Sequence, residues 1–425
     1  MERIAIVNGV RTPFCKMGTA FNFMSAQELG ALAARELIER SEMDPGLIDE
    51  VIIGNVGQPP DAANIARVIA LLAGIPKHVP AYTVHRNCAS GLESVATAAL
   101  KIQTGEASCL LVGGTESMSN IPYFFTKDLQ EILFQLSREK ALFPKLRVLS
   151  KVRLPFLAPR IGLQMGLTDP VCGLNMGQTA EVLAKEFGIT RKDQDEFALA
   201  SHQKAVKARA VLREEIVPVI PSPAYKGAVL DDNGPRESQT MEALAKLKPY
   251  FDRNSGTVTA GNSSQITDGA VALLVMKESR AKEMNLNPLG YLRSFAFAGV
   301  EPDRMGIGPA HAIPKALKKA GLRLNDMQSV EINEAFAVQV LSCLRLLESD
   351  KFAKDFGYEG YTGAIPRDTL NVNGGAIALG HPVGSSGARL LLTMLKHLKR
   401  NNLQTGVVSL CVGGGQGAAA VLEAQ

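Results

Sequence analysis

The chain has 425 residues, of which 46% are hydrophobic and 21% charged, and its formal net charge is +4. Such a composition is typical of a globular protein with a sizeable core, and so small a charge argues against nucleic-acid binding. No C-x-x-C pair occurs, so we predict neither a metal site nor a disulfide framework, and free thiols suit a reducing compartment. The cysteines are Cys15, Cys88, Cys109, Cys172, Cys343 and Cys411. No leader-like segment or membrane-spanning run is evident, and we expect a soluble, cytoplasmic protein.

Short apolar runs alternate with helical segments over the first 120 residues. A capping box, Ser25 to Glu28, begins one predicted helix, and Gly74 and Gly105 end two others. We predict strands at residues 3–9, 51–54 and 109–114 and helices at residues 25–40, 64–72 and 92–103. Strands that alternate with helices at this spacing predict a mostly parallel sheet with helices on both faces.

The pattern changes after Ile121. Residues 127–160 carry eight Lys and Arg side chains against three acidic ones, interleaved with apolar residues. Such a segment favours either a loop domain whose apolar side packs on the body or on a sister subunit, or a surface for a partner or an anionic membrane. Two helices are predicted next, at residues 179–187 and 192–209, and residues 221–257 predict an irregular excursion rich in Pro, Gly, Asn and Asp.

Alternation of strands and helices resumes near Ala270. We predict strands at residues 270–276, 289–298, 329–332, 370–372, 406–411 and 418–423, and helices after Pro309, from Glu334 and at residues 386–399. Residues 110–114 also resemble residues 410–414, and each segment follows a Ser-Gly pair that begins a helix. Two copies of one β-α-β-α-β unit explain this internal similarity.

One cysteine lies where a predicted strand passes into a predicted helix. Residues 81–84 form an extended apolar lead-in to the segment Asn87-Cys88-Ala89-Ser90-Gly91, and the helix follows. A thiol at this elbow lies near free backbone amides at the positive end of the helix dipole, which favours the thiolate and a nucleophilic role. The alternative is a buried, inert cysteine, the commonest state of a free thiol.

Two glycine-rich segments near the end of the chain carry further reactive side chains. His381 lies between Gly380 and Pro382 on a turn with open backbone around it, a suitable mount for a general base, although a lone histidine is more often a surface or core residue. Cys411 ends an apolar strand before Gly413, where exposed amides can stabilise an oxyanion; the alternative is a tight turn in which a cysteine merely fits. Two thiols and one histidine suit chemistry that needs both a covalent acyl carrier and a separate acid or base for carbon.

Together these segments resemble the thiolase family, and the resemblance runs nearly end to end. The motifs that carry it are residues 87–91, Asn333-Glu334-Ala335-Phe336, Gly380-His381-Pro382, residues 411–415, and residues 256–264 with 267–269. The resemblance implies an α/β fold of two duplicated βαβαβ halves, packed as an αβαβα sandwich with an inserted loop domain. It places the N-terminal half at residues 1–120 with 255–277, the loop domain at 121–254, and the C-terminal half at 278–425.

The resemblance also implies catalytic roles. Cys88 would attack the 3-keto carbonyl and carry the acyl group as a thioester, and His381 would act as its general base. Cys411 would be the general acid or base at carbon. Asn333 would hold a water that forms one oxyanion hole with His381, and the amides of Cys88 and Gly413 would form the other.

Four further residues resemble substrate-binding positions of the family. Ser264 corresponds to a residue beside the pantetheine chain, and Arg236 to the loop arginine near the CoA nucleotide. Met176 and Met305 correspond to pocket residues next to the reacting acyl group. The resemblance implies no cofactor and no metal, because CoA is a substrate.

The activity implied is thiolytic cleavage of a 3-ketoacyl-CoA with CoA in fatty acid β-oxidation. Asn175 stands where the short-chain branch usually has histidine, and the loop domain is longer than in that branch. The alternatives are a short-chain acetyl-CoA acetyltransferase and, in another class, a non-catalytic lipid carrier of the same fold. The expected partners are acyl-CoA and CoA, a second copy of the chain in a homodimer or homotetramer, a hydratase/dehydrogenase subunit, and a membrane surface contacted through residues 127–160.

Overall fold

A computed structural model describes residues 2–425. The first half of the chain builds one side of a mixed sheet, in the order β1-β8-β5-β3-β4. These strands are β1 (Ile4–Arg11), β3 (Glu50–Gly54), β4 (Ala81–Val84), β5 (Cys109–Ser117) and β8 (Thr267–Lys277), and the short β2 (Cys15–Lys16) pairs with β8. β3 pairs in parallel with β4 and β5, whereas β8 runs antiparallel to β1 and β5.

The second half repeats this order as β9-β12-β11-β10. Its strands are β9 (Gly290–Gly299), β10 (Ser329–Ile332), β11 (Thr405–Val412) and β12 (Gln416–Ala424). The strand predicted at residues 370–372 is wrong, because Leu370 makes only a single parallel bridge with Val330. The two sheets join where β1 pairs antiparallel with β9, Ile4 opposite Leu292 and Ile6 opposite Gly290.

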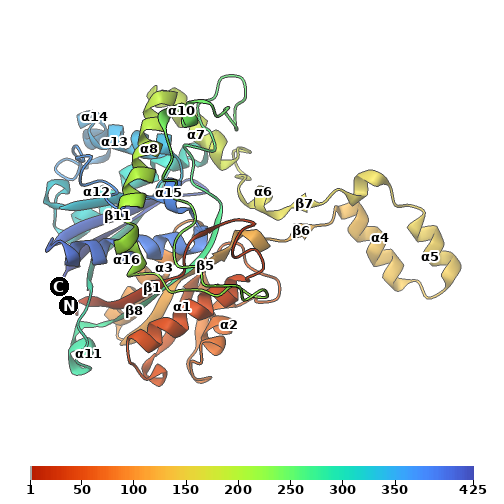
Figure 1. Cartoon of the computed structure of the whole chain (residues 1–425), viewed down its shortest axis with the longest axis horizontal. Coiled ribbons are helices and arrows are strands. Elements are labelled where there is room, and N and C mark those ends of the chain that lie inside the picture. The colour runs from red at the N-terminus through yellow and green to blue at the C-terminus, as the bar shows by residue number, and fades with distance from the viewer. Residues whose placement is uncertain (1) are drawn as a thin grey trace.

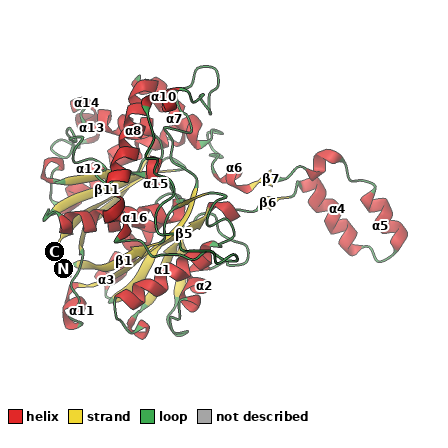
Figure 2. Ribbon diagram, in the orientation of Figure 1, coloured by secondary structure: helices red, strands yellow, loops and turns green. Residues whose placement is uncertain are grey.

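Helices form three layers around these sheets, which confirms the duplicated α/β sandwich (Figures 1 and 2). α3 (Ser90–Thr104) and α16 (Val383–Arg400) pack on each other in the central layer, in a core shared with strands of both halves. α1 (Ala26–Arg40) and α2 (Ile65–Leu72) cover the outer face of the first half. α12 (Gly308–Ala320) and α13 (Ala337–Leu347) cover the outer face of the second.

Seven further helices are short or belong to the inserted region. They are α7 (Met176–Phe187), α8 (Arg191–Lys207), α9 (Arg209–Arg213), α10 (Met241–Ala245), α11 (Glu278–Glu283), α14 (Asp350–Phe356) and α15 (Ala376–Leu379). α7 packs on α13, and α8 packs on α13 and α15, so the inserted helices rest on the second half. Only the short α10 lies within residues 221–257, which fits the predicted irregular excursion.

A buried ionic cluster ties the inserted region to the first half. Arg11 of β1 contacts Glu215 at 2.7 Å and Asp232 at 2.6 Å, and all three side chains are buried. Asp232 also accepts a hydrogen bond from the Phe14 amide at 2.7 Å. These contacts satisfy the arginine and both carboxylates, as burial of charge requires.

Residues 121–166 form an arm that projects from the body (Figure 1). Its stalk is a two-stranded ribbon, β6 (Tyr123–Phe124) with β7 (Arg160–Ile161), and α6 (Gly162–Gly166) follows. Two helices fill its outer end, α4 (Lys127–Arg138) and α5 (Leu142–Leu149). The interpretation that the apolar side of this segment packs on the body is wrong, because Leu142, Phe143 and Leu154 are 70%, 86% and 85% exposed.

None of the helices within residues 2–425 combines the length and the hydropathy that a bilayer crossing requires.

Candidate active site

Cys88 lies on a tight elbow between β4 and α3. Asn87 adopts a left-handed backbone conformation with φ +44°, which asparagine tolerates better than most residues. The Ser90 hydroxyl accepts a hydrogen bond from the Arg86 amide at 2.9 Å and donates to the Asn87 carbonyl oxygen at 2.7 Å. The elbow is therefore held by its own backbone and by one hydroxyl, and Cys88 stays partly accessible at its apex.

The backbone amides of Gly413 and Cys88 itself both contact the Cys88 sulfur. Their N–H groups lower the pKa of the thiol, but burial raises it by more, so the net shift is upward. The prediction that the elbow favours a thiolate is therefore wrong in sign, because loss of hydration outweighs the two amides. The two amides that the sequence resemblance assigned to one oxyanion hole do converge at this atom.

Cys411, the penultimate residue of β11, lies beside Cys88 in the buried core. Burial raises the pKa of its thiol well above the ordinary value, and the neighbouring thiols of Cys88 and Cys343 raise it further. Cys411 therefore keeps its proton at neutral pH, as a general acid must. The structure thus brings the two thiols together, Cys88 from the first half and Cys411 from the second.

His381 is buried on the turn that leads into α16. Gly380 has φ +104°, and a Cβ there would lie 2.3 Å from the Thr267 methyl carbon, so this turn requires glycine. The His381 amide donates to the Gln265 carbonyl oxygen at 3.1 Å, and Nδ1 lies 2.6 Å from the Ser386 hydroxyl. Burial, and then the charge of Arg389, lower the pKa of His381 to about 3, so the imidazole is neutral.

The N-termini of α3 and α16 abut, which brings the Cys88 elbow and the His381 turn together. A Cβ on Gly91 would lie 2.8 Å from the Ala388 amide nitrogen and 3.0 Å from the Gly384 carbonyl oxygen. A side chain at position 91 would keep the N-termini of α3 and α16 apart.

Asn333 completes the polar side of the site. Its amide donates to the Ser409 carbonyl oxygen at 2.8 Å, and its Nδ2 lies 3.5 Å from Nε2 of His381. Its Oδ1 is buried and has no hydrogen-bond partner among the described residues. An orphaned buried acceptor at this position suits a bound water or substrate group.

Met176 and Met305 lie in the same apolar cluster as Cys411. Met176 also lies beside Gly413, since a Cβ there would be 3.4 Å from the methionine sulfur. The Asn87 side-chain amide donates to the Gly413 carbonyl oxygen at 2.6 Å and ties this loop to the elbow. Met176 is therefore placed beside the loop that contacts Cys88, whereas Met305 is placed only within the same core cluster as Cys411. Asn175 instead caps α7, because its side chain accepts a hydrogen bond from the Gln178 amide at 3.0 Å.

Ser264 and Arg236 lie farther from the sulfur atoms. The Ser264 amide donates to the Ala335 carbonyl oxygen at 2.9 Å, which ties it to the Asn333 loop. Arg236 is exposed, and burial, followed by the charge of Arg236, lowers the pKa of both His202 and Lys16. Arg236 and Lys16 thus form a small cationic surface. Lys16 was not predicted as a site residue, and nothing in its local sequence marks it.

Ser386 and Glu116 contact the site but were not predicted. Ser386 is the only hydroxyl bonded to the His381 ring among the described residues. Its position in the first turn of a predicted helix does not indicate a role at the site. Glu116 offered a signal, because it is an acidic residue at the end of an otherwise buried apolar strand.

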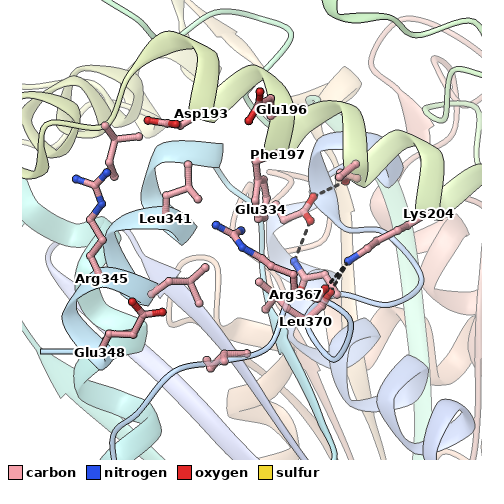
Figure 3. Close-up of a pocket in the computed structure, with 16 residues that line it drawn as sticks. Asp193, Glu196, Phe197, Lys204, Glu334, Leu341, Arg345, Glu348, Arg367 and Leu370 are labelled. Atoms are coloured by element: carbon pink, nitrogen blue, oxygen red, sulfur yellow. Dashed lines mark hydrogen bonds between the residues drawn. The ribbon is translucent and has the colours of Figure 1, made fainter.

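A cavity of about 530 Å³ lies away from the thiols. It lies between α8, α13 and the segment before Leu370, with Glu334 at its inner wall (Figure 3). The Glu334 carboxylate accepts hydrogen bonds from Ser201 at 2.6 Å and Asn371 at 2.8 Å. This cavity therefore backs the Asn333 loop. Residues 2–425 include no cluster of His, Cys, Asp and Glu side chains that could hold a metal ion.

A duplicated α/β sandwich with two thiols and a histidine at the junction of its halves defines the thiolase class. The chain belongs to the thiolase family: the model of the thiolase N-terminal domain matches residues 4–279, and that of the thiolase C-terminal domain matches residues 286–424.

Full-length relatives and solved structures agree with this assignment. The chain is 42% identical to a 3-ketoacyl-CoA thiolase of Serratia proteamaculans and 41% identical to one of Escherichia coli, with 100% of the chain and 97% of each relative covered. It is similar to the structure of human mitochondrial 3-ketoacyl-CoA thiolase in complex with CoA, with TM-score 0.85, 35% identity, and 100% and 98% coverage. An acetyl-CoA acetyltransferase from Syntrophomonas wolfei gives TM-score 0.88, 34% identity and full coverage of both chains.

Proposed function

We propose that this protein cleaves 3-ketoacyl-CoA with CoA, giving acetyl-CoA and a shortened acyl-CoA, in fatty acid β-oxidation. One observation carries the proposal: Cys88 lies against two backbone amides and a second thiol, Cys411, at the junction of the halves. The names of the full-length relatives support the substrate class. By its activity the protein is then an acyltransferase.

In the first half-reaction the Cys88 sulfur attacks the 3-keto carbon, and its proton passes to Nε2 of His381. The substrate-free site favours neither the thiolate nor the imidazolium, so proton transfer accompanies attack. The carbonyl oxygen takes the negative charge, which the amides of Cys88 and Gly413 stabilise. The C2–C3 bond then breaks, and its electron pair forms the enolate of acetyl-CoA.

Cys411 donates its proton to C2 of that enolate and releases acetyl-CoA, leaving the acyl group on Cys88. A water held by Asn333, together with protonated His381, stabilises the enolate oxygen. The imidazolium proton then returns to Cys411. In the second half-reaction His381 accepts the proton of the incoming CoA thiol, CoA attacks the thioester, and the departing Cys88 sulfur regains a proton from His381.

CoA is a substrate in this scheme, and no cofactor or metal takes part in any step. The pantetheine chain runs past Ser264, and Arg236 with Lys16 binds phosphate groups of the nucleotide. Met176 and Met305 line the acyl end. The exposed cationic surface formed by Arg236 and Lys16 supports this direction of binding.

Acetyl-CoA acetyltransferase activity is the second candidate. The specific observation in its favour is the similarity to solved structures that carry this name. The same residues would run the condensation in reverse, with Cys411 removing the C2 proton. A non-catalytic lipid carrier is disfavoured, because such a protein has no need of two thiols and a base at one site.

The arm, residues 121–166, supports contact with an anionic membrane surface. Residues 127–160 have a net charge of +5, and none of these cations forms an ion pair with the described residues. Large apolar side chains are exposed beside the cations, among them Leu142, Phe143 and Leu154. Basic and apolar side chains together bind the headgroup region of anionic bilayers, whereas the arm of a second copy would carry the same charge and repel it.

Further associations are proposed from family resemblance. A homodimer or homotetramer would cover part of the exposed surface, and a hydratase/dehydrogenase subunit would supply the 3-ketoacyl-CoA. Both suit a cytoplasmic enzyme.

The experiment is a comparison of kcat/KM for CoA-dependent cleavage of acetoacetyl-CoA and 3-ketohexadecanoyl-CoA. Preference for the long substrate supports the degradative role. Preference for acetoacetyl-CoA supports the acetyltransferase, and cleavage of neither overturns both.

A further inference from the structure

Glu116 is a fully buried carboxylate whose two oxygens accept hydrogen bonds from N–H groups. Its Oε1 accepts from the Gly57 amide at 2.8 Å and from the Asn55 side-chain amide at 3.2 Å. Its Oε2 accepts from the Val56 amide and the Gly384 amide, each at 3.0 Å. None of the salt bridges of residues 2–425 includes this side chain, so the charge is balanced by N–H groups alone.

These donors belong to two segments that are distant in sequence. Asn55 to Gly57 follow β3 of the first half, and Gly384 lies in the first turn of α16, three residues after His381. The junction is tightly packed: a Cβ on Gly384 would lie 2.7 Å from Oε2, and one on Gly114 would lie 2.0 Å from the Gly384 carbonyl oxygen. Glu116 thus bridges the first half to the turn that carries the catalytic base.

The arrangement suits an anion. The four hydrogen bonds that Glu116 accepts all come from N–H groups, which favour the ionised carboxylate. Burial raises the pKa of Glu116 to about 7, the three backbone N–H groups oppose that rise, and the nearby Asp268 carboxylate adds to it. The same negative charge raises the pKa of the Cys88 thiol. Glu116 therefore acts against the nucleophile electrostatically, which leaves positioning as its contribution.

We propose that Glu116 is a positioning residue, whose carboxylate fixes the His381 turn of the second half against the Cys88 half. This role rests on the proposed function. Displacement of a catalytic group by about 1 Å costs up to about 10²-fold in rate, so a single clamp of this kind has a measurable effect.

The test compares two variants of the full-length protein. Glu116→Gln removes the charge and places a side-chain NH2 group against backbone N–H groups. Glu116→Asp keeps the charge but shortens the reach to the Gly384 amide. We measure kcat and KM for thiolysis, and the pKa of Cys88 from the pH dependence of its alkylation by iodoacetamide, read at the Cys88 peptide by mass spectrometry.

Both variants should lose kcat at least about tenfold, with KM for CoA nearly unchanged. The pKa of Cys88 should fall in Glu116→Gln and stay unchanged in Glu116→Asp. If Glu116 served only to stabilise the fold, the pKa of Cys88 would change in the same way in Glu116→Gln and Glu116→Asp, as kcat does. Retention of kcat within about twofold of wild type in both would overturn the proposal.

If Glu116→Gln does not fold, Asn55→Ala removes one donor and leaves the carboxylate in place. It should lower kcat a few-fold, and an unchanged kcat would count against the clamp. Should wild type itself show no thiolysis, the proposed function fails, whereas the alkylation measurement still shows whether Glu116 acts on Cys88.

Discussion

The Ser386 hydroxyl lies 2.6 Å from Nδ1 of His381 and donates its only proton to the Pro382 carbonyl oxygen at 3.0 Å. With the hydroxyl proton directed at that carbonyl oxygen, the hydroxyl oxygen accepts from Nδ1, and His381 carries its proton there. Nε2 is left as the acceptor, facing Asn333. One hydroxyl therefore selects the tautomer that can accept a proton from a thiol.

Ser386→Ala should lower kcat roughly 10²-fold, the lower end of what a positioned general base contributes, because Nδ1–H loses its acceptor. Ser385→Ala is the matched control, since Ser385 also donates to the Pro382 carbonyl oxygen at 3.0 Å but makes no bond to His381. Steady-state thiolysis of both variants checks this. Equal losses in the two variants would show that the turn, not the tautomer, matters.

Asn333→Ala should reduce kcat by about 10²–10³, as loss of one oxyanion donor typically does. The side chain faces His381 at 3.5 Å and has a free Oδ1, so its removal leaves one side of the enolate site without a polar group. Stopped-flow assays should show acyl transfer to Cys88 from a saturated acyl-CoA, which forms no enolate, less affected than exchange of the C2 proton of acetyl-CoA with solvent. Equal effects on both steps would contradict an enolate role.

Asp232→Ala should destabilise the fold by about 3–5 kcal/mol, because it leaves the buried Arg11 guanidinium partly unpaired. The neighbouring Asp231→Ala breaks an exposed pair with Arg213 and should cost less than about 1 kcal/mol. Urea unfolding monitored by circular dichroism measures both free energies of unfolding. A similar small loss in the two variants would mean that water replaces the buried pair.

The stability of the fold should fall in acid through His311. Burial, then Lys315 and Arg304, lower its pKa in the folded state to about 4, so between about pH 6.5 and 4 the unfolded chain binds a proton that the folded chain does not. Stability therefore rises with pH across this window and is lost as pH falls, by at most about 3 kcal/mol for this group.

His311→Phe removes that titration while keeping an aromatic ring beside Phe352 and Phe356. The free energy of unfolding of wild type should drop relative to this variant between pH 6.5 and 4. Parallel curves for the two proteins would show that His311 is accessible to protons in the folded state.

The arm should bind vesicles according to their charge. Wild type should sediment with phosphatidylserine-containing vesicles more than with neutral phosphatidylcholine vesicles, and salt should weaken the binding. Phe143→Asp should abolish it, whereas Phe23→Asp, at a side chain 72% exposed on the body, should not. Equal binding of wild type to both kinds of vesicle, or of both variants to the anionic ones, would exclude the arm as the contact.

Most strands and the three reactive loops could be predicted from the sequence, because apolar alternation and glycine-flanked Cys and His residues are local signals. The strand expected at residues 370–372 could not be excluded, since only the pairing geometry at Val330 limits it to one bridge. The arm helices were missed because their apolar faces are exposed, which a pattern tied to a core does not anticipate.

The electrostatics of the site are harder to predict from the sequence. The Cys88 elbow predicts amides and a helix dipole but not the depth of burial, which decides the direction of the thiol pKa shift. Glu116 acts through contacts with the loop after β3 and the first turn of α16, a tertiary arrangement that no local pattern contains. Ser386 lies only five residues from His381, but its contact with the imidazole depends on the shape of the turn between them.

The central claim is that Cys88 carries the acyl group. Mass spectrometry after incubation of the protein with 3-ketohexadecanoyl-CoA, without added CoA, tests it most directly. We expect a tetradecanoyl thioester on the Cys88 peptide, with one equivalent of acetyl-CoA released and no label in Cys88→Ala. A label on Cys411 instead, or acetyl-CoA release without modification of Cys88, would contradict it.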